Sequence, residues 1–155
     1  MSLTIRRLAA VAAVAALLAA CQTTEGSGQG GSWSRFQNDY IESAFKHGPT
    51  FGASQGRHEY DGVLPDWSEA GLKAEAAFYK AAIDKAESFR DLGETERFQR
   101  YYLVANARGN LFWLETADQP HTNPAYYMGA LSPSMYTTRP YAPAATRLKA
   151  YVKYL

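Results

Sequence analysis

Residues 69–116 read EAGLKAEAAFYKAAIDKAESFRDLGETERFQRYYLVANARGNLFWLET, and this stretch decides the fold class. Apolar side chains recur through it at steps of three and four residues, which is the spacing of one face of an α-helix. The pattern is interrupted at Gly93, a typical helix-stop residue, and the acidic positions in 94–96 that follow favour a new helix start. The sequence therefore predicts two long helices, at about 69–89 and 94–116.

The short connection between these two helices favours an antiparallel hairpin. Upstream, the same spacing predicts a helix over 33–47, ended by Gly48 and Pro49. Downstream, residues 118–143 are rich in proline and tyrosine and predict short helical turns joined by loops, after which a last helix runs to Leu155. No stretch alternates long enough for a strand, so the predicted fold class is all-α, a helical hairpin with additional helices. The last helix carries no stop signal, so we expect the chain to be the amino-terminal part of a larger helical domain.

The amino terminus has the composition of an export signal. Arg6 and Arg7 precede an uncharged run over 8–20, which has the length of a signal-peptide apolar core and is short for a membrane span. The run ends in Leu-Ala-Ala before Cys21, the only cysteine of the chain, and this pattern resembles a bacterial lipobox. The alternative is an ordinary secretory signal followed by a chance cysteine. We predict that residues 1–20 are a lipoprotein signal peptide and that Cys21 carries the lipid.

The residues after Cys21 predict where the protein is held. Cys21 would be the first residue after cleavage, and its lipid chains would make the membrane a partner of the protein. Gln22 stands where aspartate would resemble an inner-membrane retention signal, which favours the outer membrane, facing the periplasm. Residues 21–32, rich in Gly, Ser, Thr and Gln, predict a flexible linker. Residues 33–155 then have the length of one helical domain.

The composition of the domain excludes two broad classes of protein. All 11 tyrosines, 7 phenylalanines and 3 tryptophans follow residue 32, which is enough apolar material for a core and excludes a disordered chain. The formal net charge of +1 becomes −1 once Arg6 and Arg7 are removed with the signal peptide. A near-neutral domain without a basic run gives no case for nucleic-acid binding.

The hexapeptide RHEYDG, residues 57–62, begins like the helical His-Glu-x-x-His motif of zinc peptidases. In that motif, histidines four residues apart share a metal from one helix face. Gly62 stands four residues after His58, and the Asp-Gly pair favours a turn over a helix. His47 and His121 stand alone in the sequence. We therefore assign no catalytic residue, no metal ligand and no cofactor to this chain.

Three segments carry a resemblance to a known family: PTFGASQGRHEYDGVLPDWS (49–68), NPAYYMGAL (123–131) and RPYAPAATRLKAYVKYL (139–155). They resemble the amino-terminal region of domain-of-unknown-function family 885, bacterial and often lipid-anchored all-helical proteins that are similar to helical zinc carboxypeptidases. The His-Glu-x-x-His helix of that family lies far downstream, and this sequence ends before it. The resemblance implies a parent zinc metallopeptidase or related hydrolase, of which this chain is an inactive part. The matching positions are Pro49, Gly56, Tyr60-Asp61, Asn123-Pro124 and Arg147-Leu148.

In a helical peptidase of this kind, the amino-terminal helices wall a substrate cleft beneath the metal. The resemblance implies that Asn123, Tyr126, Tyr127 and Arg139 face such a cleft, where they would orient a peptide and contact its carboxylate. The alternative is that Asn123 caps a turn and the tyrosines fill helix crossings. Two functions stay open: the cleft wall of a zinc-dependent peptidase or hydrolase, or a complete small helical lipoprotein that acts as a binding or scaffold module.

Overall fold

The computed structural model describes residues 29–155, and the described part contains helices, turns and loops but no β-strand. The predicted all-α fold class is confirmed. The predicted signal peptide and Cys21 lie outside the described residues, and α2 begins at Gln29, inside the stretch predicted to be linker. No helix in the described part is long and apolar enough to span a membrane. The elements are α2 (Gln29–His47), α3 (Pro49–Ser54), η1 (His58–Tyr60), α4 (Glu69–Ser88), α5 (Glu94–Leu111), η2 (Phe112–Thr116), α6 (Gln119–Thr122), η3 (Pro124–Tyr127), α7 (Ser134–Thr138) and α8 (Ala144–Tyr154).

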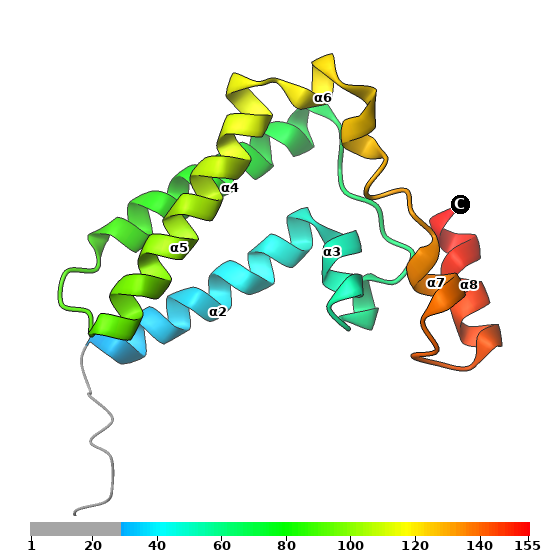
Figure 1. The fold of residues 1–155 in the computed structure, drawn as a ribbon, viewed down its shortest axis with the longest axis horizontal. Helices are drawn as coiled ribbons and strands as arrows, with labels where there is room; N and C mark the ends of the chain where they lie inside the picture. The colour runs from blue at the N-terminus through cyan, green and yellow to red at the C-terminus, as the bar shows by residue number, and fades with distance from the viewer. Residues whose placement is uncertain (1–28) are drawn as a thin grey trace, which may run out of the picture.

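Helices α4 and α5 lie side by side as the antiparallel hairpin predicted from the sequence (Figure 1). Two ion pairs fix their relative direction. Lys80 Nζ lies 2.7 Å from Glu115 Oε1, and Arg108 Nη2 lies 2.7 Å from Glu87 Oε1. Glu87 comes later along α4 than Lys80, whereas its partner Arg108 comes earlier than Glu115, so the two segments run in opposite directions.

Both helices of the hairpin begin at a side-chain cap. Ser68 Oγ accepts a hydrogen bond from the Gly71 amide at 3.1 Å, while Asp66 Oδ1 accepts one from the Ser68 amide at 3.0 Å. At the start of α5, Glu96 Oε2 accepts a hydrogen bond from the Gly93 amide at 2.8 Å. The first turn of a helix leaves amide groups without helical partners, and caps of this kind satisfy them. These bonds define where each helix of the hairpin starts.

The second helix of the hairpin ends differently from the prediction of one helix to Thr116. Regular α-helix stops at Leu111, and η2 continues as a π-helical turn in which the Ala117 amide donates to the Phe112 carbonyl at 2.8 Å. Asp118 then takes a left-handed backbone conformation, with φ of 48°, which ends the helix. The wider turn and the reversal at Asp118 lead the chain into α6.

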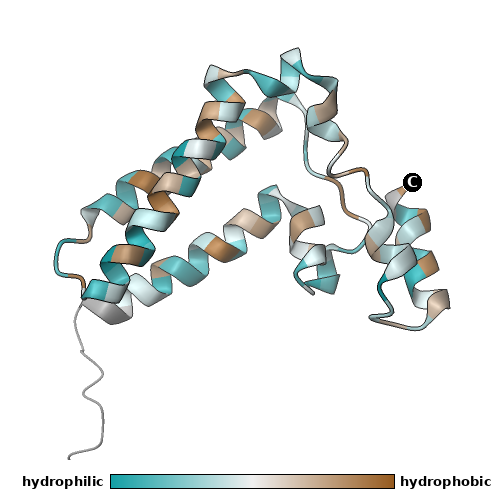
Figure 2. Ribbon diagram, in the orientation of Figure 1, coloured by the Kyte–Doolittle hydropathy of each residue, from teal (hydrophilic) through white to brown (hydrophobic). Residues whose placement is uncertain are grey.

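The core forms where α2 packs against the hairpin. Trp33 is only 1% exposed, its ring meets Phe89 edge-on at 5.3 Å between centroids, and its Nε1 donates to Gln99 Oε1 at 3.1 Å. Figure 2 shows apolar residues spaced between polar ones along α2, α4 and α5, as expected of amphipathic helices. The other buried members of the core are Ile83, Ala86, Leu92, Leu103, Val104 and Ala107.

Helices α7 and α8 pack together at the end of the molecule opposite the α4–α5 connection (Figure 1). The Gly62 amide donates to the buried hydroxyl of Tyr136 at 2.8 Å, and Arg147 Nη1 donates to the Tyr136 carbonyl at 2.6 Å. Arg139 Nη1 reaches the Ser54 carbonyl at 2.9 Å. The segment from α3 to the loop after η1 is therefore the surface on which α7 and α8 dock.

The apolar stripe of the last helix is only partly covered. Tyr151 is half-buried, with its ring 6.3 Å from that of Tyr136. Leu148 is 59% exposed and Val152 is 63% exposed. One edge of α8 thus packs against α7, while Leu148 and Val152 face solvent.

Candidate functional site

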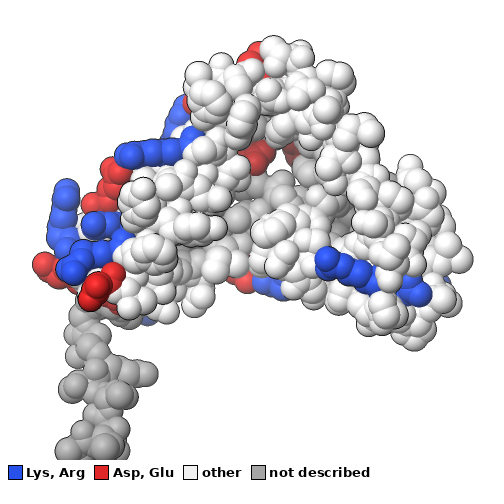
Figure 3. Space-filling model, in the orientation of Figure 1, with Lys and Arg blue, Asp and Glu red and all other residues white. Residues whose placement is uncertain are grey.

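A cavity of about 520 Å³ lies between α2, α3, α4 and α5. Figure 3 shows the molecule hollowed near its centre, where acidic atoms are visible. The volume is within the range of small-molecule and peptide pockets, which combine apolar walls with a few polar groups. Helices α2 and α3 contribute mainly apolar and aromatic side chains to the lining, among them Tyr40, Ile41, Phe45 and Phe51. Helices α4 and α5 contribute the polar side chains of Glu75, Tyr79, Asn106 and Asn110.

Glu75 brings a half-buried carboxyl group to this cavity. Burial raises the pKa of Glu75, and a hydrogen bond with Tyr79 opposes that rise. Burial is also the main cause that raises the pKa of Tyr79, followed by the negative charge of Glu75. Tyr40, on the facing helix, has a pKa raised by burial. These shifts describe an acid and two phenols that are partly shielded from water.

Two amide side chains complete the polar side of the cavity. Asn106 and Asn110 lie one turn apart on α5, and Asn110 Nδ2 donates to Asn106 Oδ1 at 3.1 Å. An amide side chain offers two N–H donors and an oxygen with two lone pairs. Each asparagine therefore keeps hydrogen-bonding capacity beyond this bond, and that capacity can serve the backbone of a ligand.

Two of the four residues predicted to face a cleft make local structural contacts. Asn123 Oδ1 accepts a hydrogen bond from the Ala125 amide at 3.0 Å and so caps η3. The Tyr127 hydroxyl donates to the Pro120 carbonyl at 2.7 Å, which ties η3 to α6. Both side chains hold the connection between the hairpin and α7 in place.

The other two predicted residues have different surroundings. Tyr126 is half-buried, and burial, followed by the charge of Glu75, raises the pKa of Tyr126 to about 12. Its hydroxyl is therefore electrostatically coupled to the acid of the cavity. Arg139 is exposed and donates to the Ser54 carbonyl. None of the four lines the cavity of about 520 Å³.

The RHEYDG loop packs against the segment that joins α7 to α8. The ring of His58 stacks on the ring of Tyr141, with 4.1 Å between the centroids. Within the loop, Arg57 Nε donates to Glu59 Oε1 at 2.7 Å. Within residues 29–155, no group of three or more His, Cys, Asp or Glu side chains is arranged to hold a metal ion. The donor groups of the described chain thus do not fit the zinc of a metallopeptidase, and no reaction step is assigned to zinc on this chain.

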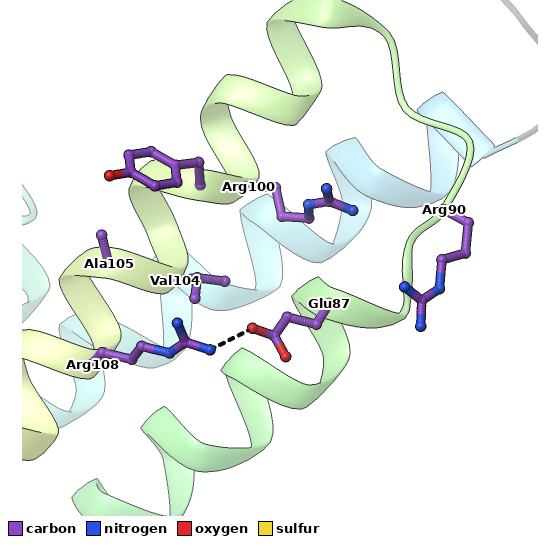
Figure 4. A pocket seen from close by; sticks show the side chains of 7 residues that line it. Glu87, Arg90, Arg100, Val104, Ala105 and Arg108 are labelled. Carbon is purple, nitrogen blue, oxygen red and sulfur yellow. Dashed lines mark hydrogen bonds and ion pairs between the residues drawn. The ribbon is translucent and has the colours of Figure 1, made fainter.

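A second hollow, of about 350 Å³, lies between α4 and α5 and is lined by three arginines (Figure 4). Figure 4 shows the guanidinium of Arg108 facing the carboxylate of Glu87, to which it is bound at 2.7 Å. Arg100 donates to the carbonyl of Phe89, at the end of α4. Two of the three arginines are therefore engaged in holding the hairpin together, and we assign them to stability rather than to ligand binding.

The sequence pattern did not single out Glu75, Tyr79, Asn106 or Asn110 as site residues. The sequence did contain a signal for a shared polar face. Glu75 and Tyr79 are four residues apart, as are Asn106 and Asn110, so the two members of each pair lie on one face of their helix. That the two faces meet α2 and α3 across a cavity depends on helix packing, which no local pattern specifies.

Comparison with known proteins gives no match, whether with protein-family models, with curated proteins or with solved structures. The resemblance to family 885 thus rests on the three segments quoted above. The basis for a functional assignment is the cavity, together with the patterns in the sequence.

Proposed function

We propose that residues 33–155 form one wall of a peptide-binding cleft in a lipid-anchored protein of the bacterial cell envelope. The cavity of about 520 Å³ carries the proposal. An extended peptide needs hydrogen-bonding partners for its backbone and apolar surface for its side chains. The side-chain amides of Asn106 and Asn110 supply the hydrogen-bonding partners, and the aromatic residues of α2 and α3 supply the apolar surface.

The envelope location is supported by the lipobox-like sequence that ends at Cys21. A parent activity of a zinc-dependent peptidase or related hydrolase is supported by the resemblance to family 885. In this proposal the residues of this chain supply peptide contacts and no catalytic group. A binding module without catalysis would use the same cavity in the same way.

Peptide binding by the full chain in detergent micelles tests the proposal. Fluorescein-labelled oligoalanine peptides are titrated with the protein, and binding is followed by fluorescence anisotropy. We expect saturable binding that unlabelled peptide displaces. Replacing both asparagines (Asn106→Ala with Asn110→Ala) should weaken binding by about tenfold, since each lost hydrogen bond costs roughly 0.5–1.5 kcal/mol.

The matched control is Asn38→Ala, which removes an exposed amide from α2 outside the residues that line the cavity. This variant should bind the peptides as the unaltered chain does. The proposal is contradicted if no peptide shows saturable binding. It is also contradicted if the two α5 substitutions change binding no more than the α2 control does.

A further inference from the structure

The cavity of about 520 Å³ between α2, α3, α4 and α5, the central cavity, has an acidic residue in its described lining without a basic one. Glu75 is the acidic residue among those that line it, and no lysine or arginine is among the described lining residues. On the same two helices, Lys80 is paired with Glu115 and Arg108 with Glu87. A carboxylate that is partly removed from water is stabilised when a cation supplies the interaction that water no longer supplies.

The tyrosines around Glu75 suit the same kind of ligand. Tyr79 is hydrogen-bonded to Glu75, and Tyr40 lines the cavity from α2. Phenol oxygens accept hydrogen bonds from a cationic N–H, and the faces of aromatic rings attract cations. A carboxylate among aromatic residues is the combination that recurs where proteins recognise amines and other ammonium groups.

We propose that Glu75, with Tyr79 and Tyr40, binds a primary ammonium group of the ligand in the central cavity. The inference rests on the proposed function, because it takes the ligand to be a peptide and places one of its amino groups. That group is the free amino terminus or a lysine side chain, which share the same chemistry. Its proton stays on the nitrogen, and the contact with the carboxylate is a charge-assisted hydrogen bond.

Other ligand groups fit this part of the cavity less well. A ligand carboxylate next to Glu75 is repelled by a like charge at low effective dielectric constant. A neutral acetylated amine leaves the carboxylate without a counter-charge and adds an amide group to be desolvated. The ammonium group is the class that both compensates the charge and supplies donors to the acceptors present.

Three alanine-based tetrapeptide amides distinguish these cases. Their affinities for the full chain in detergent micelles are measured by calorimetric titration. The first has a free amino terminus, the second is acetylated, and the third is acetylated and carries one lysine. We expect a peptide with an ammonium group to bind at least tenfold more tightly than the acetylated peptide without lysine. Which of the two cationic peptides shows this preference identifies the source of the ammonium group.

Substitutions then tie the preference to its residues. Glu75→Gln should remove the tenfold preference and leave binding of the acetylated peptide unchanged, and Tyr79→Phe should reduce the preference about threefold. Glu87→Gln, on the same helix but paired with Arg108 outside the cavity, is the matched control and should keep the full preference. In the unaltered chain, nuclear Overhauser effects from the methylene protons of n-propylammonium to the Tyr79 ring should place the amine without any substitution.

The outcomes separate this inference from the proposed function. If neither cationic peptide binds more tightly than the acetylated peptide without lysine, the ammonium site is wrong and the peptide cleft stands. If no peptide binds, the peptide cleft is wrong, and the n-propylammonium titration decides the ammonium site alone. Binding of that amine with contacts to Tyr79 supports the site, and its absence, or contacts confined to other tyrosines, overturns it.

Discussion

The hydroxyl of Tyr141 donates a hydrogen bond to Asp61 Oδ2 at 2.9 Å, although the two residues are 80 positions apart. The other carboxylate oxygen of Asp61 lies 3.3 Å from Nδ1 of His58. The Asp61 side chain is only 15% exposed, so these contacts satisfy a carboxylate that has lost most of its water. The loop that begins like a zinc-peptidase motif is thus a docking surface for the segment that joins α7 to α8.

Tyr141→Phe is expected to lower the free energy of unfolding by about 1–2 kcal/mol, the usual loss for a hydrogen bond to a charged, shielded group. The substitution removes the hydroxyl and keeps the ring that stacks on His58. Urea denaturation followed by circular dichroism measures the change. Tyr101→Phe is the control, because Tyr101 is 73% exposed. Equal losses in the two variants would show that the contact with Asp61 adds no stability.

Two glycines of the same region form a matched pair that separates backbone strain from steric exclusion. Gly62 has φ of 74° and Gly56 has φ of 91°, and both values are unfavourable for a residue with a Cβ atom. A Cβ atom on Gly62 would lie 2.8 Å from the Ala150 carbonyl oxygen, whereas nothing lies within 4 Å of one on Gly56.

Gly56→Ala should therefore cost about 1 kcal/mol of unfolding free energy, from strain alone. Gly62→Ala should cost more, by about a further 1–2 kcal/mol, because α8 must also shift. Hydrogen exchange should show faster amide exchange in α8 for Gly62→Ala than for Gly56→Ala. Similar stability and similar exchange in both variants would mean that α8 does not depend on the close approach to Gly62.

Much of the helical architecture was predictable because its signals are local. The three-and-four spacing over residues 69–116 specifies two amphipathic helices, and Gly93 with Glu96 specifies the break between them. The π-helical turn at 112–116 was not predictable, because the apolar spacing continues through it. The left-handed conformation of Asp118 that ends it has no distinct signal in an aspartate at this position.

Contacts between distant segments could not be predicted from local patterns. The sequence indicated a turn at Asp61 and Gly62, but the docking of Tyr136 and Tyr141 on that turn depends on how the whole chain folds back. The cavity has the same origin: the face that carries Glu75 meets α2 and α3 only after the hairpin and α2 have packed. Periodicity therefore predicted the helices, but neither the buried face of α5, where Phe98 and Tyr101 are exposed, nor the site between the helices.

The predicted lipid anchor is tested by Cys21→Ser, at a position outside the described residues. Without the thiol there is no atom to carry the lipid, so the protein should move to the soluble periplasmic fraction or keep its signal peptide. Cell fractionation and detergent-phase partitioning measure this. Gln22→Asp is the matched control, and it should keep the lipid but redirect the protein to the inner membrane. Unchanged processing and detergent partitioning of Cys21→Ser would contradict the prediction.

His121 links α6 to the start of α4 and should make stability depend on pH. Its Nδ1 faces the carboxylate of Asp118, and its Nε2 lies 2.7 Å from Glu69 Oε1. These hydrogen bonds, the one with Asp118 first, raise the pKa of His121 above the ordinary value of 6.5. The protonated ring is thus favoured in the folded state, so its contribution is fully present below pH 6.5 and is lost as pH rises through the folded pKa.

The thermal midpoint of the unaltered chain, relative to that of His121→Gln, should therefore fall as pH rises above 6.5. Proton NMR titration of the His121 ring gives the folded pKa directly. Glu69→Gln should move that pKa back toward 6.5, since one of the two carboxylates is removed, and Glu115→Gln, which alters a carboxylate paired with Lys80, should leave it unchanged. A His121 pKa at or below 6.5 in the unaltered chain would show that the two carboxylates do not hold the ring in its charged form.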